Sequence, residues 1–513
     1  MASRGRAILA IDVGTSGTRA GLVAADGTVS CVNHTPLAVS SPRHGVVEQD
    51  ADTLLDRTLS VARATIEQAR RDGVEIVALA LATQRATGVL WDGRSGKALV
   101  PAMVWQDTRY AKEMTALASD WDARLVAATG RPAGARSLYL WAARHIEETT
   151  AVAAARDARR LLFGTVDTWL LWHLSEERPH VTTPTNAASA GDYRLEEHDY
   201  LDSWVVAQSF PPELLPALRE DADDFGCTDQ ALLGLRVPIL ASCGDQSGAL
   251  VGLGCHEPGQ AMCVHGTGSF VWLVTGERVP AKPGAYEATF ATVGWRCEGR
   301  SRFAVETYAA ATGSALDRLC SELRWFENPR EIGHLAATVR SAEGLLFLPS
   351  LTGLRQPRIV PGARGSLTGL SLAHGRAHLA YAVLEGIAHA AVGCAEANEA
   401  SAGVRLREIA AGGGLSSSDV LLGIQADLSG VPIRRMADAD RATLRGAAFL
   451  AGSRGLFWDC LSDARATLPE GKVFTPGIGA AERQERRARW AAAVDEEIAH
   501  VSAGVHGRQE QAC

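Results

Sequence analysis

Residues 7–24 read AILAIDVGTSGTRAGLVA. Residues 7–12 form a short apolar run typical of a buried strand, and residues 19–24 form a second such run. Between them lies Gly14-Thr15-Ser16-Gly17-Thr18, a loop of glycines and hydroxyl side chains. The stretch therefore predicts two paired, buried strands joined by a polar glycine loop.

The same pattern recurs in the second half of the chain. Residues 260–275 read QAMCVHGTGSFVWLVT, a strand pattern on each side of Gly266-Thr267-Gly268-Ser269. Because a domain typically has roughly 150 residues, the length of 513 residues already argues for more than one domain, most simply two large ones. We therefore expect a duplicated architecture, with one domain over residues 1–248 and the other over residues 249–513.

The segments around these hairpins alternate between strand and helix patterns. A third strand is expected near residues 28–33, and another over residues 75–82. Between them, residues 50–72 carry apolar side chains three or four positions apart, with Asp50 as N-cap and Gly73 as stop signal. Further patterns predict strands at 237–242 and 406–410 and helices at 378–394, 443–453, 481–501 and from near Ser416. The fold class is therefore α/β.

Composition excludes several classes of protein. Apolar residues make up 46% of the chain, charged residues 21%, and the net charge is −8, which argues against a disordered chain and against a nucleic-acid-binding surface. No run of 18 apolar residues occurs, so no membrane span is expected. Ten scattered cysteines without a C-x-x-C pair favour reduced thiols and a cytoplasmic location.

The first glycine loop has the chemistry of a phosphate site. Backbone N–H groups and the hydroxyls of Thr15, Ser16 and Thr18 can point at phosphate oxygens, and Arg19 adds a fixed positive charge. Asp12 would repel phosphates unless a cation intervened, so Mg²⁺ is the natural mediator. None of the four lysines lies in a P-loop motif. The alternative is a tight turn only, and the second copy of the pattern favours the phosphate interpretation.

Two further segments carry candidate site residues. Asp245 ends a predicted strand, where a carboxylate could accept a proton from an attacking hydroxyl, or could simply cap a helix. Gly412-Gly413-Gly414 could allow close approach of an anionic ligand to a helix N-terminus, or form a plain loop. From spacing alone, both alternatives stay open.

A third group of residues could suit a polyhydroxylated ligand. Gln84 and Arg85 end a predicted strand, and Trp105, Asp107 and Arg109 follow soon after it. Aromatic faces and forked donors bind C–H groups and hydroxyls. From the residues alone, an ordinary Arg–Asp pair and a packed tryptophan are the better interpretation, and His265 is expected to be structural.

Several motifs together resemble the FGGY carbohydrate kinases, and in particular their glycerol-kinase branch. The strongest match is GSLTGLSLAHGRAHLAYAVLE at 365–385, which fits the family's second signature. Other matches, within a resemblance that runs from Ile8 to Gly455, are DVGTSGTR at 12–19, TQRAT at 83–87, VWQDTR at 104–109, LLFGTVDTWLL at 161–171, HVTTPTNA at 180–187, Gly244-Asp245-Gln246 and Gly266-Thr267-Gly268.

The resemblance implies two actin-like, ribonuclease H-like domains around a central ATP and substrate cleft, and an ATP-dependent kinase of a small polyol or sugar. It implies Asp245 as general base, Asp12 and Asp245 at Mg²⁺, and ATP as phosphoryl donor. It implies phosphate contacts from Thr15, Ser16, Thr18, Arg19, Gly266 and Thr267, nucleotide contacts from Gly313, Gly414 and Ser418, and acceptor contacts from Gln84, Arg85, Trp105, Asp245 and Gln246. A homodimer is among the assemblies that it allows.

The chain departs from glycerol kinases on the acceptor side. Ala86 stands where those enzymes carry a glutamate that binds glycerol, and Leu138 replaces a signature lysine. Residues 130–137 (GRPAGARS) are shorter and lack a tyrosine found there. Because each lost hydrogen bond is worth roughly 0.5–1.5 kcal/mol, we expect an acceptor that is larger or differently oriented, such as a tetritol, pentitol or ketose. Glycerol, a xylulokinase-like ketose kinase, and a non-catalytic ATP-binding protein stay as alternatives.

Overall fold

The computed structural model describes residues 5–284 and 288–504, to which every structural statement refers. The first sheet has the strand order β12-β5-β1-β2-β3. Its antiparallel part joins β1 (Arg6–Val13), β2 (Gly17–Ala24) and β3 (Val29–Pro36). The strands β5 (Glu75–Thr83) and β12 (Ile239–Gly244) extend the sheet on the other side of β1, parallel to it. The predicted first hairpin is thus confirmed.

The second sheet repeats this arrangement. Its order is β15-β16-β14-β13-β19-β20-β21, and β13 pairs antiparallel with β14 and parallel with β19, as β1 does with β2 and β5. The central strands are buried apolar runs in both sheets, which explains why each forms a core. The strands of the second sheet are β13 (Gln260–His265), β14 (Ser269–Gly276), β15 (Phe290–Cys297), β16 (Arg300–Ala309), β19 (Glu408–Gly412), β20 (Ile433–Arg435) and β21 (Lys472–Phe474).

Helix α1 (Ala51–Asp72) has the ends that the sequence predicts. The Asp50 carboxylate accepts a hydrogen bond from the Thr53 backbone N–H at 2.6 Å, and Gly73 closes the helix at φ +70°. Its apolar face is buried against the first sheet. Cap and stop signals therefore place this helix correctly to within one residue.

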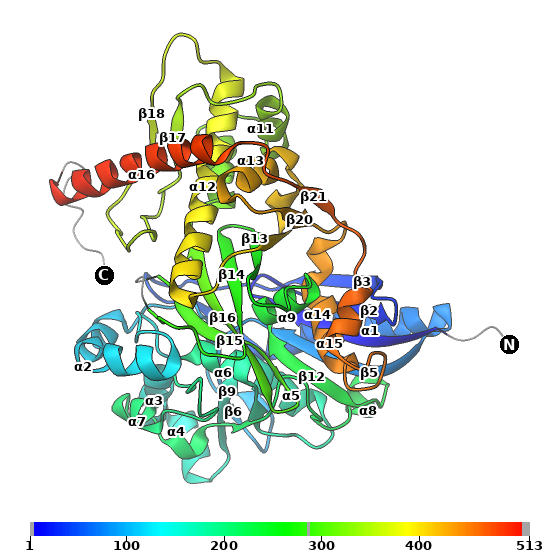
Figure 1. The fold of residues 1–513 in the computed structure, drawn as a ribbon. Helices are drawn as coiled ribbons and strands as arrows, with labels where there is room; N and C mark the ends of the chain where they lie inside the picture. The colour runs from blue at the N-terminus through cyan, green and yellow to red at the C-terminus, as the bar shows by residue number, and fades with distance from the viewer. Residues whose placement is uncertain (1–4, 285–287, 505–513) are drawn as a thin grey trace.

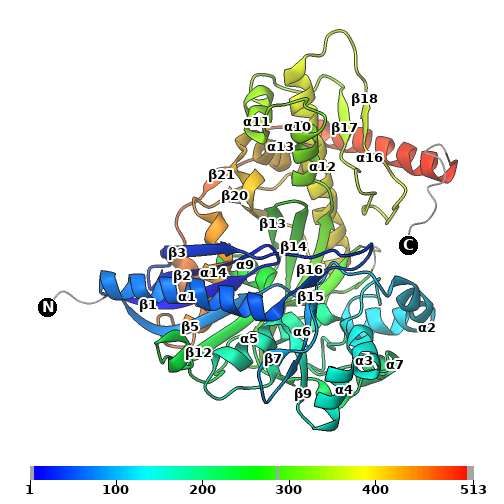
Figure 2. The same cartoon turned by 180° about the vertical axis from the view of Figure 1, so that it is seen from behind.

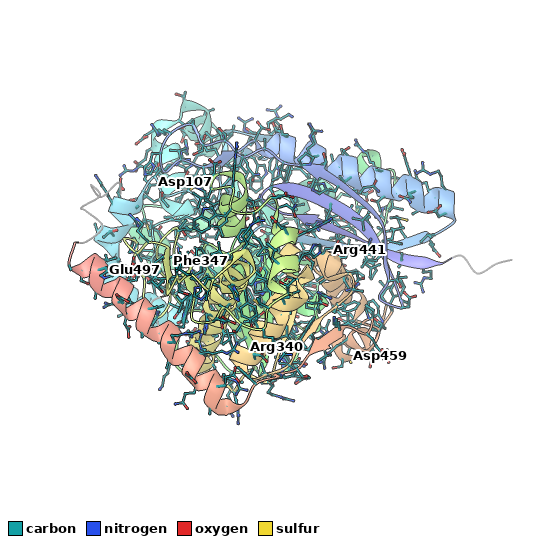
Figure 3. All side chains as sticks on the ribbon, turned by 90° about the horizontal axis from the view of Figure 1, so that it is seen from above. Asp107, Arg340, Phe347, Arg441, Asp459 and Glu497 are labelled. Atoms are coloured by element: carbon teal, nitrogen blue, oxygen red, sulfur yellow. The ribbon has the colours of Figure 1, made fainter. Side chains whose placement is uncertain are left out.

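Two helices lie between the sheets: α9 (Asp245–Gly252) and α14 (Ala442–Gly452), seen side by side in Figures 1 and 2. Glycines let their backbones touch. A Cβ atom on Gly252 would lie 1.8 Å from the Ala442 carbonyl oxygen, and one on Gly446 would lie 1.8 Å from the Gly248 carbonyl oxygen. Helix α14 comes from the C-terminal half but covers the first sheet, where Arg441 donates to the Val29 carbonyl at 2.7 Å (Figure 3).

Helix α12 (Arg376–Ala402) is the long apolar helix of the second half. Within the described residues it alone is long and apolar enough to be considered a membrane span, but 72% of its most apolar window is buried inside the structure. That burial is typical of a core helix. The helix expected to begin near Ser416 is different: a 3-10 turn, η2 (Gly414–Ser417), comes first, and α13 (Asp419–Ser429) follows.

The remaining elements surround these two layers. Helix α16 (Ala480–Ser502) buries Trp490, Val494 and Ile498, as its pattern predicts. The smaller sheets contain β4 (Glu48–Gln49), β6 (Gly88–Asp92), β7 (Lys97–Ala98), β8 (Ala102–Met103) and β9 (Leu161–Thr165), then β10 (Val181–Thr182) with β11 (Ala217–Leu218), and β17 (Leu346–Leu348) with β18 (Ser366–Thr368). The other helices are α2 (Ala111–Thr129), α3 (Leu138–Glu148), α4 (Thr150–Asp157), α5 (Val166–Leu174), α6 (Pro184–Ala190), α7 (Asp202–Ala207), α8 (Gln230–Leu233), α10 (Gly313–Ser321), α11 (Pro329–Ala336) and α15 (Leu461–Ala466), with 3-10 turns η1 (Pro212–Leu214) and η3 (Ala439–Arg441).

Candidate active site

The first hairpin carries a carboxylate and a guanidinium group opposite each other. Asp12 on β1 and Arg19 on β2 are cross-strand neighbours, with 3.3 Å between Arg19 Nε and Asp12 Oδ2. Burial raises the pKa of Asp12 to about 6; Arg19 opposes this rise, and the nearby Asp245 carboxylate adds to it. In the adjoining loop the Gly14 N–H donates to the Gly17 carbonyl at 3.0 Å. Two carboxylates near one another, with raised proton affinity, fit a place where a cation binds.

Asp245 is the first residue of α9 and follows directly on β12. Its side chain is 27% exposed, so a substrate can reach it, and its Oδ1 accepts a hydrogen bond from the Gln246 N–H at 2.8 Å. Arg85 Nε lies 3.5 Å from the same oxygen. Desolvation raises the pKa of Asp245, while Arg85 holds it back. A carboxylate that is reachable and more basic than usual is suited to accept a proton.

Arg85 connects Asp245 to the second sheet. Its two terminal nitrogens donate to Glu306 on β16 at 3.1 and 2.9 Å, and its guanidinium group lies 4.9 Å from the centre of the Trp272 ring on β14. Burial alone would raise the pKa of Glu306, but Arg85 lowers it overall. Glu306 therefore stays ionised and keeps Arg85 oriented toward Asp245.

Gln84 and Trp105 support the loop of the first hairpin through contacts that lead to Thr15. The Gln84 amide is fully buried and donates to Gln49 Oε1 at 2.8 Å, and Gln49 in turn donates to the Thr15 carbonyl at 2.7 Å. Trp105 Nε1 donates to Thr15 Oγ1 at 2.8 Å. Both predicted acceptor residues thus hold Thr15 in place. Of the residues predicted here, Gln246 differs, because its Oε1 is buried without a partner in the described structure.

The sequence DTR at 107–109 is structural, as the residues alone suggest. Asp107 is fully buried; its carboxylate binds the Arg109 guanidinium group at 2.6 Å and accepts from the Val47 N–H at 2.7 Å. Figure 3 shows Asp107 among the side chains of the N-terminal half. This pair fixes the loop that presents Trp105, without facing the predicted base.

The second hairpin packs against the start of α10. The Thr267 carbonyl accepts from the backbone N–H groups of Thr312 at 3.2 Å and Ser314 at 3.1 Å, and the Gly313 N–H donates to the Gly266 carbonyl at 3.1 Å. A Cβ atom on Gly313 would lie 2.3 Å from that carbonyl oxygen, so only glycine fits. Gly266, Thr267 and Gly313 are therefore brought together, as predicted.

The triple glycine joins the same region. Gly413 has φ +79°, and a Cβ there would lie 2.3 Å from the His265 carbonyl oxygen. Gly414 has no atom within 4 Å of its Cβ position, so its surroundings are open. Ser418 caps α13 by accepting from the Leu421 N–H at 3.3 Å, so its hydroxyl is already used. His265 is structural, as expected: it is buried and bonded to Ser269 and Gln425.

The acceptor side differs from what the sequence suggests at position 86. Ala86 is 2% exposed and adopts φ +53°, and it packs in an apolar cluster that also contains Met103, Leu138 and Trp141. The position that the sequence associates with the acceptor is therefore buried among apolar side chains. Glu306 is not among the predicted site residues. It directly follows the apolar run Phe303–Val305 in β16, and a charged residue at such a buried strand position is a signal that could have found it.

The structure has two related sheets with a glycine hairpin in each, and a reachable carboxylate, Asp245, directly after β12; two such sheets with a carboxylate at a strand end are compatible with a phosphoryl-transfer enzyme. Comparison with known families agrees: residues 7–252 match the N-terminal domain, and residues 261–454 the C-terminal domain, of the FGGY family of carbohydrate kinases. The chain belongs to this family. It is accordingly a two-domain kinase that phosphorylates a polyol or sugar with ATP.

Known relatives agree with the family assignment. The chain is 35% identical to a glycerol kinase of Thermus brockianus, over 97% of this chain and 99% of that protein. It is 33% identical to a glycerol kinase of Rhodopirellula baltica, over 96% and 90%. Among solved structures, Plasmodium falciparum glycerol kinase with ADP superposes with TM-score 0.89 at 22% identity, covering 96% of this chain and 98% of that one. A Rhodospirillum rubrum xylulose kinase gives 0.83 at 24%, covering 96% and 99%. The predicted boundary after residue 248 falls inside α9 and stays a prediction.

Proposed function

We propose that the reaction takes place between Asp245 and the two hairpins, with Asp245 as general base for the acceptor hydroxyl. The observation that carries this is the position of Asp245, reachable at the start of α9 and held by Arg85, which Glu306 anchors from the other sheet. A bound hydroxyl near Asp245 Oδ2 would transfer its proton there as its oxygen attacks the γ-phosphorus of ATP.

The first hairpin would stabilise the transferring phosphoryl group. Arg19 and the hydroxyls of Thr15, Ser16 and Thr18 can donate to its oxygens, and the buried Thr18 Oγ1 has no partner in the described structure. Gly266 and Thr267 would hold the terminal phosphates from the opposite side, and Gly313, Gly414 and Ser418 would line the nucleotide. Donors already in position need no reorganisation during transfer.

Asp12 and Asp245 are the residues proposed to hold Mg²⁺. Within residues 5–284 and 288–504, no three His, Cys, Asp or Glu side chains form a cage for a metal ion. Mg²⁺ in kinases needs only one or two carboxylates, with water and substrate phosphates as its other ligands. When bound, it would neutralise charge on the phosphates. The Asp245 carboxylate raises the pKa of Asp12, and this closeness of two carboxylates supports a cation site between them.

The acceptor side supports a hydroxylated ligand through Arg85, Gln246 and, indirectly, Gln84 and Trp105. We propose an acceptor larger than glycerol or bound in another orientation. A panel of glycerol, tetritols, pentitols and ketoses, measured by acceptor-dependent ADP release, separates a polyol kinase from a ketose kinase. Binding of ATP with no acceptor-dependent ADP release across the panel would indicate the non-catalytic alternative.

Asp245→Asn tests the base directly. The amide cannot accept the proton, so we expect kcat to fall by about 10²–10⁴-fold, while ATP affinity and the melting temperature stay at wild-type level or slightly above. Asp56→Asn, on the exposed face of α1, is the matched control with unchanged kcat. Transfer by Asp245→Asn at the wild-type rate would show that another group takes the proton.

Location and assembly complete the proposal. All nine described cysteines are free thiols, which supports a cytoplasmic location. We propose a homodimer as the state in solution, and light scattering on the purified protein gives the mass that tests it.

A further inference from the structure

A cluster of arginines lies beside the proposed base and has no complete set of counter-charges. Arg131 Nη1 donates to the Ser189 carbonyl at 2.8 Å, and Arg136 Nη2 donates to the same oxygen at 3.3 Å. Arg85 Nη1 donates to the Ser189 hydroxyl at 3.1 Å. Three guanidinium groups therefore converge on one residue at the end of α6, and one of them is the partner of Asp245.

Carboxylates do not balance these charges. In the part of the chain that the structure describes, Glu306 pairs with Arg85, and no carboxylate lies within 4.0 Å of the guanidinium groups of Arg131 or Arg136. Three positive groups thus share Glu306 and Asp245. Burying a cation without a counter-ion is costly unless something else compensates.

Neutral contacts hold Arg131 and Arg136 in place. Arg136 Nη1 donates to the Trp105 carbonyl at 2.8 Å, and the Arg131 guanidinium group lies 5.1 Å from the centre of the Phe290 ring. Arg131 Nε is buried with no hydrogen-bond partner. Burial lowers the pKa of both guanidinium groups to about 10, which still leaves them fully charged at neutral pH. Both groups are therefore oriented by neutral partners, and Arg131 keeps one nitrogen without a partner.

The surroundings add further positive charge. Arg355 stacks over the Tyr308 ring at 4.0 Å, and Tyr308 belongs to the same strand as Glu306. Arg131 and Arg136 both come from the short segment that joins α2 to α3, on the acceptor side of Asp245. A ligand with one anionic end and a hydroxyl at the other would satisfy both the arginines and the base.

We propose that Arg131 and Arg136 bind a carboxylate of the acceptor, which is a polyhydroxy acid of the aldonic type, phosphorylated at a hydroxyl remote from its carboxylate. Planar guanidinium groups match a carboxylate in geometry and charge. The inference rests on the proposed function. The acceptor oxygen forms a bond to the γ-phosphorus, the bond from that phosphorus to the bridging oxygen breaks, ADP leaves with the electron pair, and Asp245 takes the hydroxyl proton.

Matched pairs of acceptors test the proposal: aldonates of three to six carbons, each against the alditol of the same length and configuration, with one sugar phosphate as a further arm. We expect the best aldonate to exceed its alditol by at least about 100-fold in kcat/KM, the size of two charge-assisted hydrogen bonds. Preference for an alditol or ketose throughout would overturn the carboxylate site and leave the kinase intact. Preference for the sugar phosphate would assign the arginines to a phosphate instead and overturn the proposal.

Variants separate binding from folding. Arg131→Met and Arg136→Met should each raise KM for the aldonate by about 10–100-fold, with a small change in kcat and a smaller rise in KM for the alditol. Arg136→Lys should recover part of the KM loss. Arg144→Met, an exposed arginine on α3 that pairs with Glu147, is the control and should leave KM unchanged. An unchanged KM in both test variants would overturn the proposal.

Binding measured without phosphoryl transfer separates the anion site from the proposed kinase function. We expect the preferred aldonate alone to raise the melting temperature of the wild-type protein, and not that of the double variant Arg131→Met/Arg136→Met. Stabilisation by an aldonate that is never phosphorylated would keep the anion site and remove the proposed function. Absence of both stabilisation and phosphorylation with every aldonate would overturn the carboxylate site.

Discussion

The two glycine hairpins have the same fold and different chemistry. In the first, the strand positions before the loop pair Asp12 with Arg19, and in the second the corresponding pair is Val264 with Phe270. One step nearer the loop, Thr18 has a buried hydroxyl without a partner, whereas Ser269 is bonded to His265 and Thr312. At these positions the first hairpin carries a charged pair and an unpaired buried hydroxyl, whereas the second carries an apolar pair and a hydroxyl bonded within the protein.

The difference indicates how the two copies of a duplicated sheet can take separate roles. If the proposed function is right, charged and unsatisfied groups lie where charge moves during phosphoryl transfer, and satisfied groups surround a backbone surface that holds the nucleotide. The predictions below change residues of one hairpin or of its contacts.

Among the hairpin variants, the largest effect is expected for Asp12→Asn. Loss of this carboxylate removes a proposed Mg²⁺ contact, so kcat should fall by roughly 10²–10³-fold, as measured by ADP release at saturating ATP. A kcat within threefold of wild type at low Mg²⁺ would contradict the role.

The same variant should be more stable, and the sign follows from the pKa. The Asp12 pKa rises from 3.8 to about 6 on folding, so the ionised group costs stability above pH 6, and the cost disappears as the pH falls from 6 to 3.8. Without Mg²⁺, Asp12→Asn should therefore gain roughly 1–3 kcal/mol in unfolding free energy at pH 8 and nothing at pH 3.5. A loss of stability at pH 8 would show that the charge is well compensated in the fold.

A smaller effect is expected for Gly313→Ala, which affects the second hairpin alone. The new methyl group would lie 2.3 Å from the Gly266 carbonyl oxygen, so the loop must shift. We expect KM for ATP to rise by about tenfold or more, with little change in acceptor KM. Gly423→Ala, a helical site with no atom within 4 Å, is the control. Equal ATP affinity of the two variants would place the nucleotide elsewhere.

The smallest effects are expected for the hydroxyls of Thr18 and Ser269. Loss of the first should change the kinetics, and loss of the second should change the stability. Thr18→Val should lower kcat/KM for ATP by about tenfold and leave stability unchanged, because its hydroxyl has no internal partner. Ser269→Ala should cost about 1–2 kcal/mol of unfolding free energy and change kcat/KM less than threefold. Urea unfolding and steady-state kinetics on both variants decide this, and a reversed pattern would remove the distinction between the hairpins.

Local pattern was enough for most of the framework. The hairpins, α1 and α16 depend on burial periodicity and caps within a few residues, which a sequence displays directly. The helix expected near Ser416 is present, but it begins at Asp419 for a local reason too: Gly413 turns the chain at φ +79°, and Ser418 is the cap of α13.

The contacts that complete the site lie beyond such patterns. Arg85 and Glu306 are 221 positions apart, and Trp105 reaches Thr15 across 90. Nothing in either segment reveals its partner, because pairing follows from how the two sheets pack. The acceptor side shows the same limit: Arg131 and Arg136 look like surface charges until Ser189 is seen between them.

The glycine contact between α9 and α14 has a mechanical consequence. Main-chain atoms meet there directly, at Gly252 and Gly446, and main-chain atoms have no rotamers through which to yield. Asp245 is the first residue of α9. The helix that carries the proposed base is therefore positioned by direct backbone contact with α14, which yields less than a contact between side chains. A single methyl group added at Gly252 or Gly446 would therefore push the two helices apart and displace the proposed base from a distance.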